Sequence, residues 1–131
     1  ARAIIKEPKI YFFDSGYIIG DDGKRMENTA ALLLKKHVSF LCDSTGAKTS
    51  LHYIRTKEGN EVDFAISNND NLSQLIEVKV SDNSLSKKLC YFAKRYRTAE
   101  AVQLVLNIKH NEFKNGIKIT NASEWLAGLK A

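Results

Sequence analysis

The amino-acid sequence predicts an α/β fold in which helices flank a mixed central sheet, with a core in the order α-β-β-β-α-β. Three observations indicate this order. Apolar residues recur at helical spacing in Arg25–Cys42, apolar runs of strand length alternate with turn formers in Leu51–Val80, and a second helical pattern precedes the apolar run Ala101–Leu106. Of the 131 residues, 44% are hydrophobic and 27% charged, which is typical of one globular domain with a substantial core.

The chain divides into a short connector and one domain. Residues 1–9 end in Glu7-Pro8-Lys9 and are expected to form a connector, followed by a single domain over residues 10–131. The apolar run Ile10–Phe13 predicts a buried strand that stops at the turn formers Asp14-Ser15-Gly16. Because the sequence opens on Ala1 rather than methionine, we expect a domain excised from a longer protein.

The first helix carries an acid on its apolar face. Ala31, Leu34, Val38 and Leu41 recur at steps of three and four residues and form one apolar stripe. Glu27 lies on the same stripe, one turn before Ala31. One interpretation is that the helix dipole favours an acid near the N-terminus. The other is that the Glu27 carboxylate faces the sheet, where further acids are expected.

Three strands are expected to follow as an antiparallel meander. Leu51–Thr56 predicts the first strand, and the turn formers of Lys57–Asn60 lead into the second. The stretch Glu61–Val80 holds two apolar runs separated by Ser67–Asn71, which is typical of a hairpin. Side chains alternate between the two faces of a strand. One face of the hairpin is therefore expected to carry Val62, Phe64, Ile66, Ile76, Val78 and Val80.

The opposite face of this hairpin brings charged side chains together. Asp63 from its first strand converges on Glu77 and Lys79 from its second. Two acids and a lysine held on rigid strands are what a metal-dependent phosphodiesterase requires. The alternative is an ion pair across an exposed sheet face, which contributes little to stability. That alternative is weakened because the two helices should cover part of the sheet.

The acid-x-lysine triplet is not specific by itself, since it occurs four times in the sequence. Glu7-Pro8-Lys9 has a proline at its centre, Asp22-Gly23-Lys24 is a turn, and Glu112-Phe113-Lys114 lies in a polar connection. Only Glu77-Val78-Lys79 lies inside an apolar strand with an aspartate in the preceding strand. The functional hypothesis therefore depends on this triplet.

A basic helix is expected after Ser81–Ser84, a run of residues that favour helix caps. Leu85, Leu89, Phe92 and Tyr96 give it an apolar face. Its other side carries the basic residues Lys87, Lys88, Lys94, Arg95 and Arg97. This side is either a solvated face or a surface that holds a phosphate backbone beside the acids, and the sequence favours neither interpretation.

The passage Leu75–Leu106 reads strand, helix, strand, which implies a parallel strand pair joined by a right-handed crossover. The tail predicts a weak strand at Ile117–Ile119 and a short helix capped by Ser123, with Trp125 packing onto the body of the domain.

Composition limits the classes of function. The net charge of +5 is compatible with nucleic acid. Cys42 and Cys90 lie far apart and form no C-x-x-C pair, so we interpret them as reduced thiols of a cytoplasmic protein, with a disulfide as the alternative. The scattered histidines argue against zinc. No apolar run approaches the ~20 residues that span a bilayer, so we expect no membrane association. Gly46-Ala47-Lys48-Thr49 lacks the glycine spacing of a phosphate-binding loop, so nucleotide binding is not predicted.

The ordered set of Glu27, Asp63 in E-V-D-F, and Glu77-Val78-Lys79 resembles the signature of the PD-(D/E)xK nuclease superfamily. This resemblance implies the restriction-endonuclease-like fold, which Holliday-junction resolvases share. Val62 stands where the superfamily has its proline. The helix after Lys79 contains no glutamine, so the glutamine-tyrosine motif of RecB-like members is missing and a resolvase-like or diverged enzyme is favoured.

Other motifs resemble a narrower group, the C-terminal domain found behind AAA+ ATPase modules in bacteria and archaea. They are K-I-Y-F-F-D-S-G at 9–16, Y-I-R-T-K at 53–57, E-V-D-F at 61–64, I-E-V-K at 76–79 and E-W-L near the end. The resemblance covers nearly the whole chain. It implies an upstream AAA+ ATPase module in the same chain, with a winged-helix segment.

The resemblance implies a role for each charged residue. Asp63 and Glu77 are expected to bind Mg²⁺ or Mn²⁺, hard ions that prefer carboxylate oxygens. Glu27 is expected to bind a second ion or to orient a water, and Lys79 to position or activate the attacking water. For Asp14 a turn cap, and for Tyr53 a packing role, are the better interpretations.

The leading hypothesis is therefore a metal-dependent phosphodiester hydrolase, a DNA nuclease-like domain working with an upstream ATPase. The alternative is a catalytically inactive nuclease-fold module that binds DNA or a protein partner for the ATPase. A third possibility is a purely structural docking or oligomerisation domain.

Overall fold

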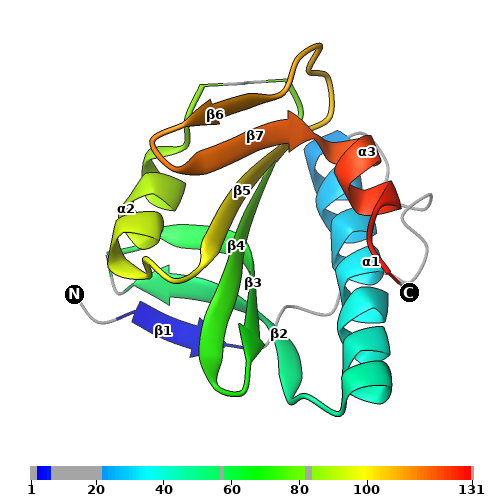
Figure 1. The fold of residues 1–131 in the computed structure, drawn as a ribbon. Coiled ribbons are helices and arrows are strands. Elements are labelled where there is room, and N and C mark those ends of the chain that lie inside the picture. Colours follow the sequence, from blue (N-terminus) through cyan, green and yellow to red (C-terminus); the bar gives the residue numbers. More distant parts are fainter. Residues whose placement is uncertain (1–2, 7–21, 57, 82–83, 131) are drawn as a thin grey trace.

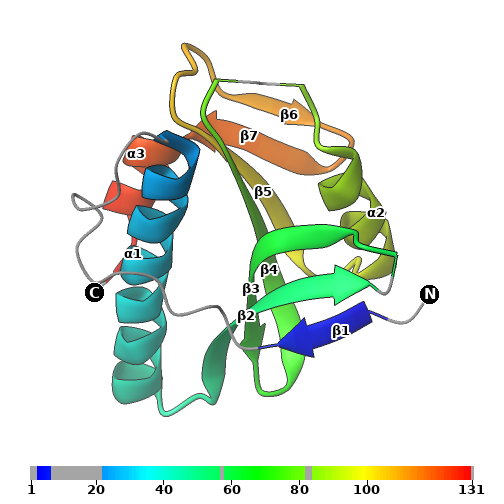
Figure 2. The same cartoon turned by 180° about the vertical axis from the view of Figure 1, so that it is seen from behind.

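The computed structural model describes residues 3–6, 22–56, 58–81 and 84–130, which form one mixed sheet with helices on both faces (Figures 1 and 2). Helices α1 (Asp22–Thr45) and α3 (Ala122–Ala127) cover one face, and α2 (Lys87–Arg95) covers the other. The expected α/β class is thereby confirmed. None of the described helices is long and apolar enough to cross a membrane.

The described part of the sheet has seven strands in the order β1-β2-β3-β4-β5-β7-β6. The strands are β1 (Ala3–Lys6), β2 (Thr49–Thr56), β3 (Glu61–Asn68), β4 (Asn71–Lys79), β5 (Glu100–Val105), β6 (Glu112–Lys114) and β7 (Ile117–Asn121). The elements α1, β2, β3, β4, α2 and β5 follow the predicted order. Within the expected connector, β1 pairs antiparallel with β2. The strand expected at Ile10–Phe13 lies outside the described residues.

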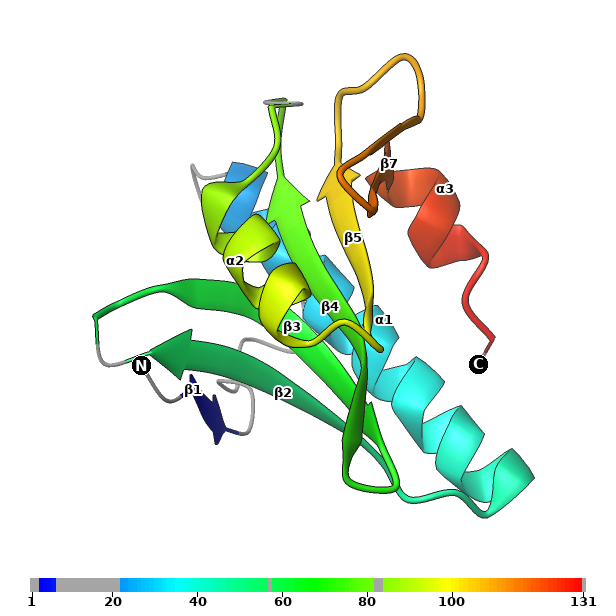
Figure 3. The ribbon, with the colours of Figure 1, turned by 60° about the vertical axis from the view of Figure 1, so that its left-hand side comes forward.

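The expected meander and crossover are both present. Strands β2, β3 and β4 are antiparallel neighbours, and β4 pairs parallel with β5 after the passage through α2 (Figure 3). Parallel neighbours need a crossover of this kind, since a tight turn can only join antiparallel strands. The crossover places the N-terminus of α2 close to the end of β4, and this arrangement positions the candidate site.

Two hydrophobic clusters fix the helices on the sheet. Under α1 and α3, buried Leu34 and Val38 pack with residues of the central strands. Under α2, Leu89 and Phe92 are fully buried against the other face. The apolar stripes predicted for both helices are therefore the buried ones, and helix stability here comes from packing rather than from intrinsic propensity.

Four local expectations are corrected by the structure. Val62 packs in the α2 cluster rather than beside Phe64, because the register between β2 and β3 shifts here. Ala65 pairs with His52 but Val62 pairs with Ile54, so β3 has one extra residue and its side-chain alternation is interrupted. The triplet at 112–114 forms the short strand β6 instead of a connection, since it pairs with β7. Helix α2 is capped by Ser86 rather than within 81–84. Helix α3 is capped by Asn121, not Ser123, because its side chain accepts a hydrogen bond from the Glu124 amide.

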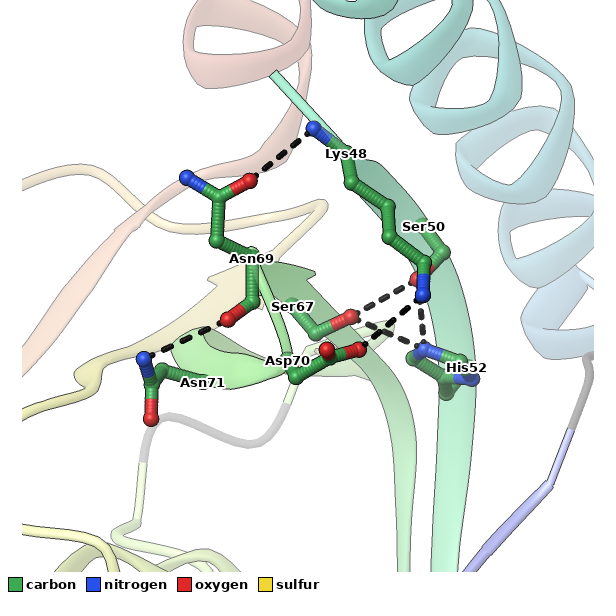
Figure 4. Close-up of polar contacts among 7 residues, drawn as sticks. All are labelled: Lys48, Ser50, His52, Ser67, Asn69, Asp70 and Asn71. Atoms are coloured by element: carbon green, nitrogen blue, oxygen red, sulfur yellow. Dashed lines mark hydrogen bonds and ion pairs between the residues drawn. The ribbon is translucent and has the colours of Figure 1, made fainter.

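The β3–β4 hairpin turns in two residues that both have left-handed backbone angles. Asn69 has φ 51° and Asp70 has φ 69°, the signs of a type I′ turn, which suits the twist of the strands. The Asn69 side chain accepts a hydrogen bond from the Lys48 amide at 3.1 Å (Figure 4). Beside this turn, Ser50, His52 and Ser67 contact one another through their side chains at 2.7–3.0 Å.

Replacing Asp70 with glycine is expected to raise the free energy of unfolding by about 0.5 kcal/mol, because glycine adopts positive φ without a steric penalty. The ion pair lost with Lys48 is mostly solvent-exposed, so its loss costs little. Thermal unfolding of Asp70→Gly measures the gain. Asn69→Gly is the contrast, since it also removes the bond to the Lys48 amide, and an equal gain in both variants would contradict the explanation.

Candidate active site

An open cleft of about 530 Å³ lies where four elements meet. Its lining comes from the N-termini of α1 and α2, the start of β3 and the end of β4. The four residues that the sequence singled out, Glu27, Asp63, Glu77 and Lys79, all line it. The topology thus brings together side chains from the first helix and from two later strands.

The cleft exists because β3 and β4 stop pairing before they end. The recorded pairs between the two strands end at Phe64 and Ile76. Beyond them the Asp63 carboxylate accepts a hydrogen bond from the Val78 amide at 2.9 Å, so a side chain takes the place of a backbone carbonyl. A polar side chain that satisfies a strand amide in this way lets the strands separate without leaving a buried donor unpaired.

Asp63 and Glu77 form a close acidic pair. The pKa of Asp63 is raised from 3.8 to about 8, mainly by burial and then by the negative charge of Glu77 and a hydrogen bond between the two side chains. The Val78 amide and the charge of Lys79 lower it. Glu77 is itself buried, with 7% of its surface exposed, and accepts a hydrogen bond from the Ser86 hydroxyl at 3.1 Å. The cleft therefore holds two neighbouring carboxyl groups, and at neutral pH Asp63 keeps its proton because two buried negative charges side by side are unfavourable.

The carboxyl groups of Asp63 and Glu77 suit a hard divalent cation. Mg²⁺ is commonly held by one or two carboxylates and keeps several waters, so the Asp63–Glu77 pair offers a suitable set of oxygens. Among the residues that the structure describes, no three His, Cys, Asp or Glu side chains are grouped closely enough to hold an ion. Glu27 lines the same cleft from α1 without completing such a group. The donor set fits a Mg²⁺-like ion rather than zinc, which prefers four protein ligands in structural sites.

A buried amide supports this site, and the sequence interpretation missed it. Gln103 on β5 is fully buried and lies opposite Glu77 in the parallel register. Its Oε1 accepts a hydrogen bond from the Ser86 amide at 2.9 Å, and its Nε2 donates one to the Ser84 carbonyl at 2.8 Å. Ser86 in turn caps α2 through the Leu89 amide. The available signal was a single polar residue inside the apolar run 101–106.

The basic residues divide into groups. Lys87 and Lys88 line the cleft, at the first turn of α2. Lys87, Lys94 and Arg95 line a second, shallow groove on the outer side of the helix. Arg97 is exposed after the helix and lines neither. Of the weaker candidates, half-buried Tyr53 lies on β2 and is not among the lining residues, and Asp14 lies outside the described residues.

Comparison with known proteins gives a family and no characterised relative. Neither the curated proteins nor the solved structures include a match to this chain. The family described as "Domain of unknown function (DUF4143)" matches residues 22–125, from the first residue of α1 into α3. Because this match covers most of the 131 residues, the chain belongs to the DUF4143 family.

Proposed function

We propose that this domain is a metal-dependent phosphodiester hydrolase that acts on nucleic acid, with DNA as the expected substrate. The observation that carries the proposal is the buried acidic pair of Asp63 and Glu77, which lines one cleft with Lys79. In a structural ion pair each acid faces a cation, whereas here two buried carboxyl groups face each other and are joined by a hydrogen bond. A divalent cation bound between them would favour the ionised form of both.

Each residue has a role that follows from its position. Asp63 and Glu77 hold Mg²⁺ or Mn²⁺, and the hydrogen bonds from the Val78 amide and the Ser86 hydroxyl keep their carboxylates oriented. An ion held there would supply Lewis acidity for attack on a phosphate. Lys79 positions the attacking water and offsets the charge that develops on the phosphate. Glu27, which lines the cleft from α1, orients a water or a second ion.

The fold supports the same proposal. The order α1-β2-β3-β4-α2-β5, with β4 and β5 parallel, is the order expected of a restriction-endonuclease-like core. The separation of β3 from β4 at Asp63 gives a substrate phosphate access to both acids. The resemblance of the sequence motifs to domains behind AAA+ ATPase modules supports an upstream ATPase as the working partner.

The test combines metal binding with a cleavage panel. Calorimetry is expected to show saturable binding of Mn²⁺ that Asp63→Ala abolishes. With Mg²⁺ or Mn²⁺ present, the chain is expected to cleave at least one of single-stranded, duplex, branched and supercoiled DNA. Lys79→Ala should lower that rate at least about a hundredfold, the smaller end of the contribution of a positioned proton-transfer group.

Lys48→Ala is the matched control, because it removes the same charge at the far end of the sheet, where Lys48 pairs with exposed Asp70. Its cleavage rate should equal that of the wild type. Circular dichroism shows that each variant is folded. If the wild type binds neither ion and cleaves none of these substrates, the hydrolase proposal fails, and a non-catalytic binding module takes its place.

A further inference from the structure

The outer side of α2 carries a groove that the proposed hydrolytic site does not use. Its volume is about 610 Å³, and its lining is Lys87, Cys90, Tyr91, Lys94 and Arg95. We propose that this groove, which we call the α2 groove, binds single-stranded nucleic acid, with a base stacked on Tyr91 and backbone phosphates on the surrounding cations. The binding itself is independent of the hydrolytic site, and only its use in feeding the cleft rests on the proposed function.

Tyr91 is presented as a rigid aromatic surface. It is 38% exposed, and its ring meets Phe92 edge to face, with centroids 5.1 Å apart and an interplanar angle of 81°. Phe92 is fully buried, so this contact restricts the movement of the Tyr91 ring. Arg95 also donates a hydrogen bond of 3.5 Å to the Tyr91 hydroxyl. A ring held in this way loses little conformational entropy when a base stacks on it.

Two of the charges of α2 lie where they cost the helix stability, while Lys94 and Arg95 lie in the last turn, where the dipole favours them. The helix contains four cations and no acid within its nine residues. Lys87 and Lys88 lie in the first turn, where the helix dipole disfavours positive charge. Ordinary helix stability would place acids at these positions. A row of cations beside an exposed aromatic ring is instead the composition of surfaces that bind single strands.

The α2 groove and the cleft are continuous through one residue. Lys87 lines both, and α2 runs from the end of β4 towards the start of β5 (Figure 3). A nucleic-acid strand that lies along α2 would therefore lead to Asp63 and Glu77. The exposed ring distinguishes between substrate classes, because base faces are stacked inside a duplex and available only in a single strand.

The two cysteines provide a direct test. Cys90 lines the α2 groove, whereas Cys42 belongs to α1 and donates a hydrogen bond to the Thr49 carbonyl. With EDTA present to prevent cleavage, an oligothymidylate of about 16 nucleotides, the upper site size of a single-strand binding module, is expected to slow alkylation of Cys90 at least about fivefold. The rate at Cys42 should not change. Mass spectrometry of the alkylated peptides measures both rates in one sample.

The comparison ligands decide the class of partner. A duplex of the same length and polyglutamate, each at equal charge concentration, should protect Cys90 less than the single strand does. Equal protection by the duplex would overturn the single-strand assignment, and equal protection by polyglutamate would indicate an acidic protein segment instead. No protection by the oligothymidylate would overturn the proposal as a whole.

Variants of Tyr91 test the stacking. Tyr91→Phe keeps the ring and should bind the oligothymidylate within about twofold of the wild type, while Tyr91→Leu should bind about tenfold more weakly, as expected for one lost stacked base. Equal binding by the wild type and both variants would contradict the stacking. Cleavage without Tyr91-dependent binding would leave the hydrolase proposal standing alone, and Tyr91-dependent binding without metal binding or cleavage would leave only this inference.

Discussion

Asp63→Asn is expected to abolish metal-dependent cleavage and, at the same time, to make the folded chain more stable above neutral pH. The pKa of Asp63 is about 8 in the folded chain and near 3.8 when it is exposed. Below 3.8 the carboxyl group is protonated in both states, and above 8 in neither. Between these values only the folded state keeps the proton on Asp63. The stability that this proton gives the folded chain is therefore lost as the pH rises through this window.

The size of the effect follows from the width of that window. In metal-free buffer the wild type should lose on the order of 4 kcal/mol of unfolding free energy between about pH 5 and pH 8, since one proton contributes about 1.4 kcal/mol per pH unit. Asparagine still accepts the hydrogen bond from the Val78 amide and donates one to Glu77 at every pH. The variant should therefore show little of this slope and be the more stable protein at pH 8. Urea unfolding at several pH values measures both curves.

Glu58→Gln is the matched control, because it removes an exposed carboxylate in the turn before β3. Its stability should follow the wild-type curve. Adding Mn²⁺ should stabilise the wild type and leave Asp63→Asn unchanged, because an ion that binds only the folded state adds to its stability. If the curves of the wild type and Asp63→Asn stay parallel, the acidic pair is not held as we describe.

The secondary structure that could be predicted from the sequence is the part with strong periodicity. Leu34 and Val38 on α1 and Leu89 and Phe92 on α2 have helical spacing, and all four are buried. Short elements were missed because their pairing partners decide them. Nothing in the sequence of β6 distinguishes it from a loop, and only its pairing with β7 makes it a strand.

The candidate site, too, could be predicted from the sequence only in part. Alternation along β3 and β4 predicted that Asp63, Glu77 and Lys79 share one region, and these residues do line one cleft. What alternation cannot predict is where two strands separate, since that depends on a hydrogen bond between the Asp63 side chain and a distant amide. Nor can it predict the pairing of Glu77 with β5, which follows the crossover through α2.

Gln103→Leu is expected to lower the free energy of unfolding by about 3 kcal/mol, the largest loss of stability that we predict for a substitution. Leucine has a similar volume, so packing in β5 changes little. The substitution removes the Oε1 acceptor and the Nε2 donor of the Gln103 side chain. The buried Ser86 amide and the Ser84 carbonyl therefore lose their hydrogen bonds. An unpaired buried group costs about 1–3 kcal/mol, and the Ser86 amide is the buried one, since Ser84 is exposed. Chemical unfolding at a single pH measures the change.

Gln74→Leu is the matched control, because this half-buried glutamine lies on the neighbouring strand β4, paired with Glu100. It should change stability by less than about 0.5 kcal/mol.

If the hydrolase proposal is correct, Gln103→Leu should also slow cleavage, since Ser86 holds both the cap of α2 and the carboxylate of Glu77. Equal stability of the two variants would show that the buried amide does not support the loop. A loss of stability with an unchanged cleavage rate would show that Glu77 is positioned without Ser86.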